Sequence, residues 1–248
     1  MRSCIGIAVI ASLLLAGAAS AQTTVQTELM MLCDISGSID EVEFELQRAG
    51  YANAFRNSIV QDLIGEAPGG VAATMIWWSG PDEQEPAVGW SHLTDAASCE
   101  AFANVIEASI RPFKDGVTAP GSAINFGAPQ FWTNDFLSSY QVLDVSGDGI
   151  ENAGDSTAVA RDAALLAGIE RINGLAIQSH AVEQWYIENI QGGEQSFTYF
   201  AEDFDDFADA VSLKIKREIT PIPEPSTCAL LGLGILGAAG MYMRRRRS

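Results

Sequence analysis

The sequence is poor in the residues on which most catalytic and nucleic-acid-binding sites depend. Its 248 residues include 14 lysines and arginines against 32 aspartates and glutamates, two histidines and four cysteines. A chain with a formal net charge of −18 is repelled by nucleic acid and by anionic membrane surfaces, and it attracts divalent cations. The sequence lacks a G-x-S-x-G nucleophile elbow, and His92 and His180, which we expect in loops, follow no metal-ligand spacing. We therefore exclude nucleic-acid binding and predict that the protein is not an enzyme.

The N-terminal segment has the features of a secretory signal peptide. Arg2 is followed by an apolar run over residues 5–16 and by the small residues Ala19-Ser-Ala21. This pattern predicts export, with cleavage before Gln22.

The C-terminal segment carries three features in a fixed order. Pro223-Glu-Pro225 precedes an apolar run over residues 228–243, which leads into Arg244–Arg247. The run is short for a transmembrane helix, which needs about 20 apolar residues. The order resembles the PEP-CTERM sorting signal of exopolysaccharide-producing Gram-negative bacteria, which an exosortase processes. The resemblance implies export across the inner membrane, a transient anchor through this helix, and then a location at the cell surface or outside the cell. A plain tail anchor is the alternative.

One domain remains between the predicted signal peptide, residues 1–21, and the predicted sorting signal, residues 221–248. Without those two segments 9 basic and 31 acidic residues are left, for a net charge of about −22. Two cysteines remain, Cys33 and Cys99, which either pair or stay as buried thiols. The length of this domain, residues 22–220, suffices for one substantial hydrophobic core.

Apolar runs typical of buried strands alternate with segments of helical periodicity throughout this domain. The predicted strands cover residues 29–33, 71–78, 87–93 (antiparallel), 140–145, 172–177 and 197–201. The predicted helices cover residues 40–63, 95–110, 119–131, 155–170, 182–190 and 204–217. This alternation predicts an α/β fold with a doubly wound, mostly parallel central sheet and helices on both faces.

Oxygen-bearing side chains gather in three predicted loops. Asp34-Ile-Ser-Gly-Ser38 follows the first strand, Thr118 precedes a predicted helix in the pattern Thr-x-x-Gly, and Asp148-Gly149 follows a later strand. Open α/β sheets hold ligands beyond the carboxyl ends of their strands. Two carboxylates and three hydroxyls match the oxygen ligands that Mg²⁺ prefers, and Mn²⁺ or Ca²⁺ is also possible. Neutral hydroxyls leave such an ion with positive charge to offer a carboxylate from another molecule.

These three motifs in this order resemble the metal-ion-dependent adhesion site of von Willebrand factor A (vWA) domains. The resemblance covers residues 27–217 and implies that Ser36, Ser38 and Thr118 coordinate the ion, while Asp34 and Asp148 bind it directly or through water. The stretches 34–44 and 142–149 also resemble a bacterial branch of that superfamily with no assigned function.

Other interpretations of the same residues stay open at this point. Asp34, Ser36, Ser38 and Thr118 also suit helix caps and turns. Asp144 is an alternative to Asp148 if its strand stops early, although Asp-Gly favours Asp148 as the strand exit.

The sequence thus predicts an exported vWA-like module that binds a protein or an acidic glycan through a carboxylate held on a divalent metal. An exported metal-dependent hydrolase is the second hypothesis, and a structural matrix component with a vestigial site is the third. We expect Asp34→Ala to abolish metal binding without unfolding the sheet, because Asp34 is expected in a surface loop.

Overall fold

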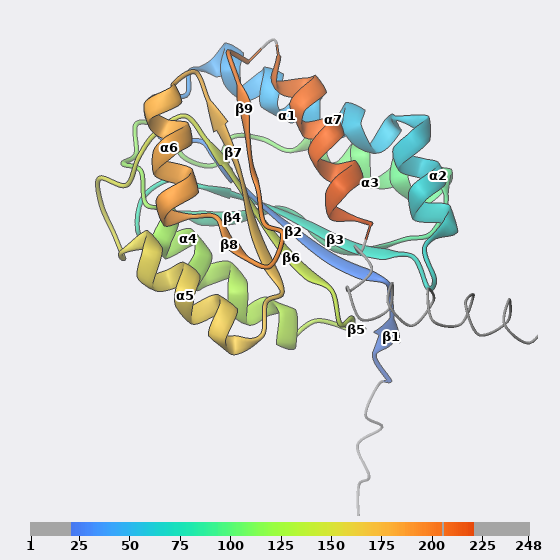
Figure 1. The fold of residues 1–248 in the computed structure, drawn as a ribbon. Coiled ribbons are helices and arrows are strands. Elements are labelled where there is room, and N and C mark those ends of the chain that lie inside the picture. The colour runs from blue at the N-terminus through green and yellow to red at the C-terminus, as the bar shows by residue number, and fades with distance from the viewer. Residues whose placement is uncertain (1–20, 205, 221–248) are drawn as a thin grey trace, which may run out of the picture.

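The computed structural model describes residues 21–204 and 206–220, and these residues form one α/β unit (Figure 1). Its strands are β1 (Thr23–Thr24), β2 (Thr27–Asp34), β3 (Val71–Trp78), β4 (Gln84–Leu93), β5 (Phe136–Leu137), β6 (Gln141–Gly147), β7 (Arg171–Ile177), β8 (Gly192–Gly193) and β9 (Thr198–Ala201). Its helices are α1 (Glu41–Arg56), α2 (Ser58–Glu66), α3 (Ala96–Ala108), α4 (Pro120–Gly127), the 3₁₀ helix η1 (Ala128–Trp132), α5 (Thr157–Ala167), α6 (His180–Asn189) and α7 (Phe207–Glu218).

The central sheet has seven strands and is mostly parallel. Its order is β4-β3-β2-β6-β7-β8, and β9 also pairs with β7. β4 and β8 run antiparallel to their neighbours, whereas β3, β2, β6, β7 and β9 are parallel. The chain moves from β2 to β3 on one side and later to β6 on the other. This reversal places a topological switch point at the carboxyl ends of β2 and β6, where such sheets hold ligands.

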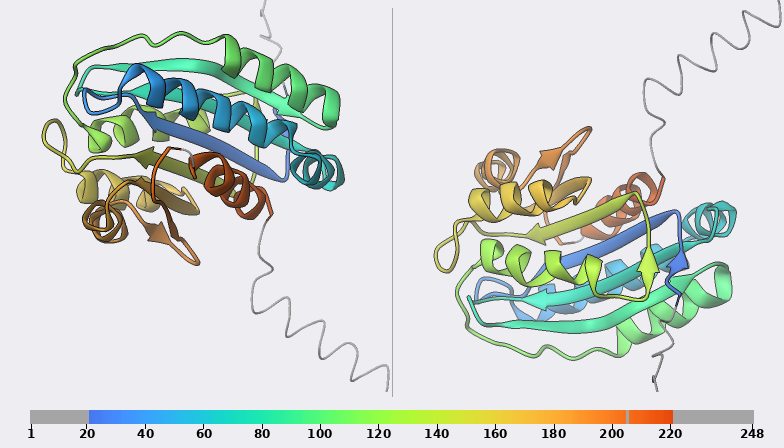
Figure 2. Two further views of the ribbon diagram at one scale, coloured as in Figure 1. Left: turned by 90° about the horizontal axis from the view of Figure 1, so that it is seen from above. Right: turned by 90° about the horizontal axis from the view of Figure 1, so that it is seen from below.

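Helices cover both faces of the sheet, as the three views show (Figures 1 and 2). Alternate residues of β2 enter different cores because successive side chains of a strand point to opposite faces. Leu29, Met31 and Cys33 pack with α1, α2, α3 and α7. Met30 and Leu32 pack with α4, η1, α5 and α6. β2 is therefore buried along its whole length, which confirms the predicted doubly wound fold.

Several predicted boundaries differ from the observed ones. The helix expected over residues 40–63 is two helices, because Asn57 ends α1 and its side chain accepts a hydrogen bond from the Ile59 amide to cap α2. The helix expected over 119–131 changes to 3₁₀ geometry after Gly127, where Pro129 cannot donate a backbone hydrogen bond. β4 begins at Gln84, and α7 begins at Phe207.

His92 lies in β4, as the predicted strand over residues 87–93 implies, and His180 is the first residue of α6, so the expectation that the histidines lie in loops is wrong. Cys33 and Cys99 are free, buried thiols, which settles the alternative left open by the sequence.

The predicted signal peptide, apart from Ala21, and the predicted C-terminal helix lie outside the described residues. Within the described part of the chain, no helix combines the length and apolar character needed to cross a membrane.

Candidate functional site

The five residues singled out in the sequence belong to three segments that meet at the carboxyl edge of the sheet. Asp34 is the last residue of β2, Ser36 and Ser38 lie between β2 and α1, and Asp148 follows β6 directly. Thr118 lies two residues before α4. The fold therefore brings together residues that are far apart in the chain.

Hydrogen bonds connect the three segments through the candidate side chains themselves. The Thr118 hydroxyl donates to the Ser36 hydroxyl over 3.2 Å, and the Ser38 hydroxyl donates to Asp148 Oδ1 over 2.7 Å. The Ser36 and Ser38 hydroxyls lie 3.4 Å apart. The Ser36 amide donates to Asp34 Oδ1 over 2.7 Å. All five residues thus form one connected cluster.

Backbone contacts fix the position of Thr118 between its two neighbouring segments. The Gly37 amide donates to the Gly116 carbonyl, which joins the β2–α1 loop to the segment before Thr118. On the other side, the Thr118 amide donates to Asn152 Oδ1 over 2.9 Å and the Asn152 amide donates to the Thr118 carbonyl over 3.0 Å. The sequence analysis did not assign Asn152 to the site.

Asp34 is fully buried, so the expectation that it lies in a surface loop is wrong. The strand continues one residue further than predicted, because Asp34 pairs with Trp78 of β3. Burial, together with the charge of Asp148, raises the pKa of Asp34 from 3.8 to about 7, although hydrogen bonds from Ser36 oppose the shift. Burial also raises the pKa of Asp148, while the hydrogen bond from Ser38 lowers it.

The second carboxylate oxygen of Asp34 has no hydrogen-bond partner among the described residues, and neither does the buried Tyr186 hydroxyl. Both atoms face Gly147, the last residue of β6. A Cβ atom on Gly147 would lie 2.7 Å from Asp34 Oδ2 and 2.6 Å from Tyr186 Oη, closer than side chains tolerate. A glycine is therefore required here for β6 to pass beside the carboxylate.

Arg111 binds the backbone of the loop between β2 and α1, and no signal in the sequence pointed to it. One of its terminal nitrogens donates to the carbonyls of Ile35, Ser36 and Ile39 over 3.0, 3.2 and 2.7 Å. Its charge opposes the rise in the pKa of Asp34, but it forms no ion pair with either candidate carboxylate among the described residues. Gln47 adds a hydrogen bond from its side-chain amide to the Asp34 carbonyl over 3.1 Å. Arg111 and Gln47 thus fix the backbone and leave the carboxylates without a protein cation.

β6 continues past Asp144 to Gly147, so Asp148 and not Asp144 is the acidic residue at the end of this strand. Asp144 is buried within β6 and contacts Lys214 of α7, on the face of the sheet covered by α1 and α7. Asp148 alone contacts the cluster.

The residues present fit a divalent cation. Two carboxylates and three hydroxyls converge, and one buried carboxylate oxygen lacks a partner in the described part of the chain. The described residues hold no cluster of three or more His, Cys, Asp or Glu side chains arranged for a metal, so such an ion would rely on the hydroxyls. This is the donor chemistry that Mg²⁺ accepts.

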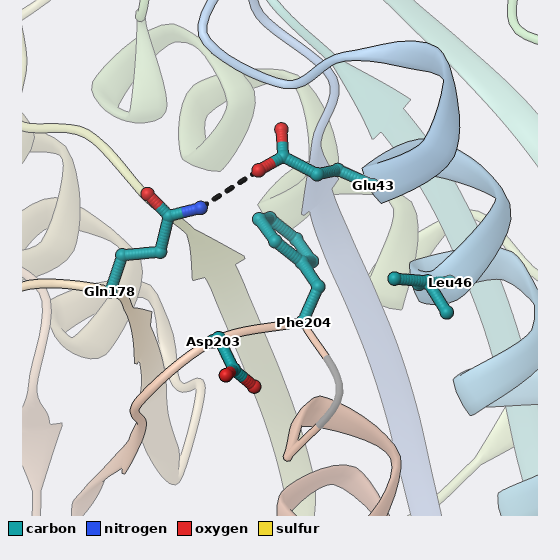
Figure 3. Close-up of a pocket in the computed structure, with 5 residues that line it drawn as sticks. All are labelled: Glu43, Leu46, Gln178, Asp203 and Phe204. Atoms are coloured by element: carbon teal, nitrogen blue, oxygen red, sulfur yellow. Dashed lines mark hydrogen bonds between the residues drawn. The ribbon is translucent and has the colours of Figure 1, made fainter.

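A shallow pocket of about 190 Å³ includes Glu43 of α1 in its lining. Figure 3 shows the residues that line it. Its lining residues are Glu43, Leu46, Gln178, Asp203 and Phe204. Glu43 accepts hydrogen bonds from Gln178 Nε2 and from the Asp40 amide, each over 2.8 Å. Its charge raises the pKa of Asp148, which places the pocket at the rim of the candidate site.

Comparison with models of protein families assigns the chain to one family. The family described as "Protein of unknown function (DUF1194)" matches residues 24–223. The chain belongs to the DUF1194 family. A PEP-CTERM protein-sorting motif matches residues 221–247 of this DUF1194 chain, which confirms the resemblance of its C-terminal segment. A search of curated proteins returned no match.

Solved structures show that this DUF1194 chain has the vWA fold. Proximal thread matrix protein 1 from the mussel byssus aligns with a TM-score of 0.60 and 16% identity, covering 80% of this chain and 47% of that one. The pilus adhesin SpaC from Lactobacillus rhamnosus GG aligns at 0.58 and 15%, covering 78% and 30%. A von Willebrand factor type A protein from Catenulispora acidiphila aligns at 0.54 and 12%, covering 78% and 43%. The chain thus spans less than half the length of these proteins.

Proposed function

We propose that this protein is an exported, non-catalytic binding module that holds one divalent cation at Asp34, Ser36, Ser38, Thr118 and Asp148. The cation, with Mg²⁺ as the first candidate, lends a coordination position to a carboxylate of another molecule. The observation that carries this proposal is the pair of carboxylates beside three hydroxyls, with a buried Asp34 oxygen that lacks a partner among the described residues.

The electrostatics of the cluster support a cation at this position. Asp34 and Asp148 repel each other, and no lysine, arginine or histidine of the described residues forms an ion pair with either. A buried carboxylate without a partner is costly unless it takes up a proton or a metal. Because the other ligands are neutral hydroxyls, the bound ion keeps enough positive charge to attract a further carboxylate.

Two of the similar proteins add support by analogy. One structure of the mussel protein, aligned with a TM-score of 0.55 at 18% identity, has a zinc-occupied MIDAS motif, and SpaC is a pilus adhesin. Both are less than 25% identical to this chain, so they motivate the proposal by fold and motif rather than by close relationship.

The position of the site in the domain suits a role at the cell surface. The Ile219 carbonyl accepts hydrogen bonds from Gln26 and Thr27, beside the start of β2. The described chain ends at Thr220, directly before the sorting motif matched from residue 221, so its last residues lie at the edge opposite to Asp34. The eight residues of β2 separate these edges by roughly 23 Å. The candidate site therefore lies at the edge of the domain opposite to the point where the described chain ends.

Neither histidine is placed to act as a general base at the candidate site. The His92 ring contacts the Gly69 carbonyl at 2.7 Å, and His180 pairs with Glu183 at 2.8 Å. Neither histidine contacts the five candidate ligands. A general base must lie within hydrogen-bond reach of the proton that it takes.

Calorimetric titration of residues 22–222 with Mg²⁺ and Mn²⁺ tests the proposal. This fragment contains the complete sheet and both cores. We expect saturable binding of one ion, which Asp34→Asn abolishes because a neutral amide cannot replace the buried carboxylate. Asp62→Ala, which removes an exposed carboxylate on α2, should bind normally.

Circular dichroism of each variant separates loss of the ion from loss of the fold. If Asp34→Asn does not fold, Ser38→Ala removes an exposed ligand instead. A folded wild-type protein without saturable binding would overturn the proposal and favour a matrix component with a vestigial site.

A further inference from the structure

Three charged side chains meet inside the core between the sheet and α7. Lys214 of α7 contacts Asp144 of β6, and its ammonium nitrogen lies 3.0 Å from Glu218 Oε1, one turn further along the helix. All three residues are at most 1% exposed. Lysine, aspartate and glutamate are almost never fully buried unless they are paired. Here one lysine faces two carboxylates, so pairing alone leaves a negative charge in the core unless one of the acids keeps a proton.

The surroundings of the three residues hold them in one arrangement. Asp144 pairs in the sheet with Met31 of β2 on one side and with Asn173 of β7 on the other. α7 packs beside α1 over this face of the sheet (Figure 1), and its residues Val211 and Ile215 enter the same core as Met31. The lysine and its two acids are thus fixed by packing and kept away from bulk water.

Asn173 orients Glu218 toward the lysine. The Asn173 side-chain oxygen accepts a hydrogen bond from the Phe197 amide over 3.1 Å, which directs its Nδ2 to Glu218 Oε1 over 2.9 Å. Glu218 Oε2 has no hydrogen-bond partner among the described residues. Burial raises the pKa of Glu218 to about 7 and also raises that of Asp144, while the charge of Lys214 opposes both shifts. One oxygen of Glu218 is therefore fixed beside the lysine, and the other is available to carry a proton.

An amine held against a carboxylic acid in a dry core can condense with it. In water the two groups stay charged and hydrated, whereas burial favours their neutral forms. Burial lowers the pKa of Lys214 but the two carboxylates raise it overall, so the lysine must pass its proton to one of them before it reacts. Fixed proximity corresponds to effective concentrations of about 10⁵–10⁸ M. Condensation also removes the charges from the core, which an ion pair does not.

We propose that Lys214 and Asp144 form an isopeptide bond, a covalent amide between two side chains, with Glu218 as the acid and base of the reaction. The neutral Lys214 nitrogen attacks Cγ of protonated Asp144 and forms the N–C bond. Glu218 donates its proton to the departing hydroxyl and takes one from the nitrogen, so it ends unchanged. The C–O bond breaks and one water leaves, without an oxidant or a co-reactant. The ion pair described above is the reactant state.

The bond would join the last helix of the domain to the middle of the sheet. α7 ends at Glu218, and the sorting motif matches from residue 221. Tension on the C-terminal end of the domain therefore acts first on α7. The isopeptide bond would pass this tension to β6 through a covalent link instead of through helix packing alone. The inference does not depend on the proposed function, because none of the candidate metal ligands takes part.

Intact-mass spectrometry of the unfolded fragment 22–222 tests the bond. The fragment carries an N-terminal tag, because a terminal Gln22 would itself cyclise and change the mass. Loss of one water should place the mass about 18 Da below that of the sequence. Trypsin does not cleave after an amidated lysine, so we expect one branched fragment that joins residues 115–161 to residues 172–216. Tandem mass spectrometry then places the junction at Asp144 and Lys214.

Matched variants assign the reacting groups. Lys214→Met and Asp144→Ala should each have the full mass of their sequence, whereas Lys216→Met on the same helix should keep the loss of water. Glu218→Gln should form the bond at least about 100-fold more slowly, because it lacks the group that moves the protons. The wild-type mass is decisive even if one of these variants does not fold.

Three results would overturn the inference. The first is a wild-type protein with the full mass of its sequence. The second is a loss of water that persists in Lys214→Met, as a cyclic imide at Asp148-Gly149 would give. The third is a loss of about 17 Da with the junction at Asn173, since ammonia rather than water leaves from an amide side chain.

Discussion

Two pairs of acidic residues are buried or half-buried near β6. One pair contacts a buried lysine, and the other contacts only neutral donors. Asp144 within β6 and Glu218 at the end of α7 share Lys214, whose ammonium lies 3.0 Å from Glu218 and contacts Asp144. Asp34 and Asp148, at the carboxyl edge of the sheet, have only hydroxyl and amide donors. We call the first the lysine cluster and the second the edge cluster.

The difference lies in where the compensating cation comes from. The lysine cluster is closed, since Lys214, Asp144 and Glu218 are all at most 1% exposed and Asn173 donates to Glu218 over 2.9 Å. In the edge cluster, Asp34 and Ser36 are buried, whereas Ser38 is exposed to solvent. A cluster that contains its own cation serves the fold, whereas a cluster that lacks one and reaches the surface can take a cation from solution. Aspartate thus has a structural role at position 144, within β6, and a proposed binding role at position 148, directly after β6.

The largest expected effect is on the lysine cluster. Lys214→Met removes its only lysine and leaves two buried carboxylates facing each other. We expect the free energy of unfolding to fall by about 3–5 kcal/mol in chemical denaturation. Lys216→Met on the same helix, at a half-buried position that forms no ion pair among the described residues, should change stability little. Similar stability in the two variants would show that the lysine cluster does not hold α7 to the sheet.

The next effect distinguishes Asp144, within β6, from Asp148, which follows β6 directly. Asp148→Ala removes a candidate ligand and should weaken Mg²⁺ binding by at least about 10–100-fold, the range found even for side chains that only support metal ligands. Asp144→Ala should leave Mg²⁺ affinity nearly unchanged and instead alter stability, because its partner is Lys214. Calorimetric titration of both folded variants makes the comparison. A larger loss of Mg²⁺ affinity in Asp144→Ala than in Asp148→Ala would mean that the metal binds near Asp144 instead.

Much of this arrangement could be predicted from the sequence because it depends on local patterns. The alternation of strands and helices predicted the sheet, and Asp-Gly after an apolar run predicted Asp148 as the strand exit. Asp40, the first residue of the predicted helix, is the N-cap of α1, and Glu43 completes a capping box. Such features depend on neighbouring residues, which a single sequence displays.

Contacts between distant segments could not be predicted in this way. Arg111 reaches Ile35 across 76 positions, and nothing in its neighbourhood distinguishes it from a surface arginine. Lys214 looks like one of several charged residues of α7 until the helix packs on the sheet. The burial of Asp34 depends on one additional residue pair between β2 and β3, which periodicity does not define. These features arise from tertiary packing.

The smallest expected effect is the pH dependence of the edge cluster. The pKa of Asp34 is raised from 3.8 to about 7 in the metal-free protein, mainly by burial and then by Asp148. The folded state therefore keeps a proton that the unfolded state has lost, so this group lowers stability as pH rises from about 4 to about 7. A cation must displace that proton, so Mg²⁺ affinity should fall by up to about tenfold per pH unit below pH 7.

Titrations at pH 6 and pH 8 in buffers of different ionisation enthalpy measure this proton directly. Release should approach one proton per ion at pH 6 and become small at pH 8, because Asp34 is then already ionised. Equal release at both pH values would mean that Asp34 is not the group that the ion deprotonates. In the lysine cluster, burial likewise raises the pKa of Glu218 to about 7, but Lys214 already supplies the positive charge there. Proton release on Mg²⁺ binding should therefore persist in Glu218→Gln, which distinguishes the open cluster from the closed one.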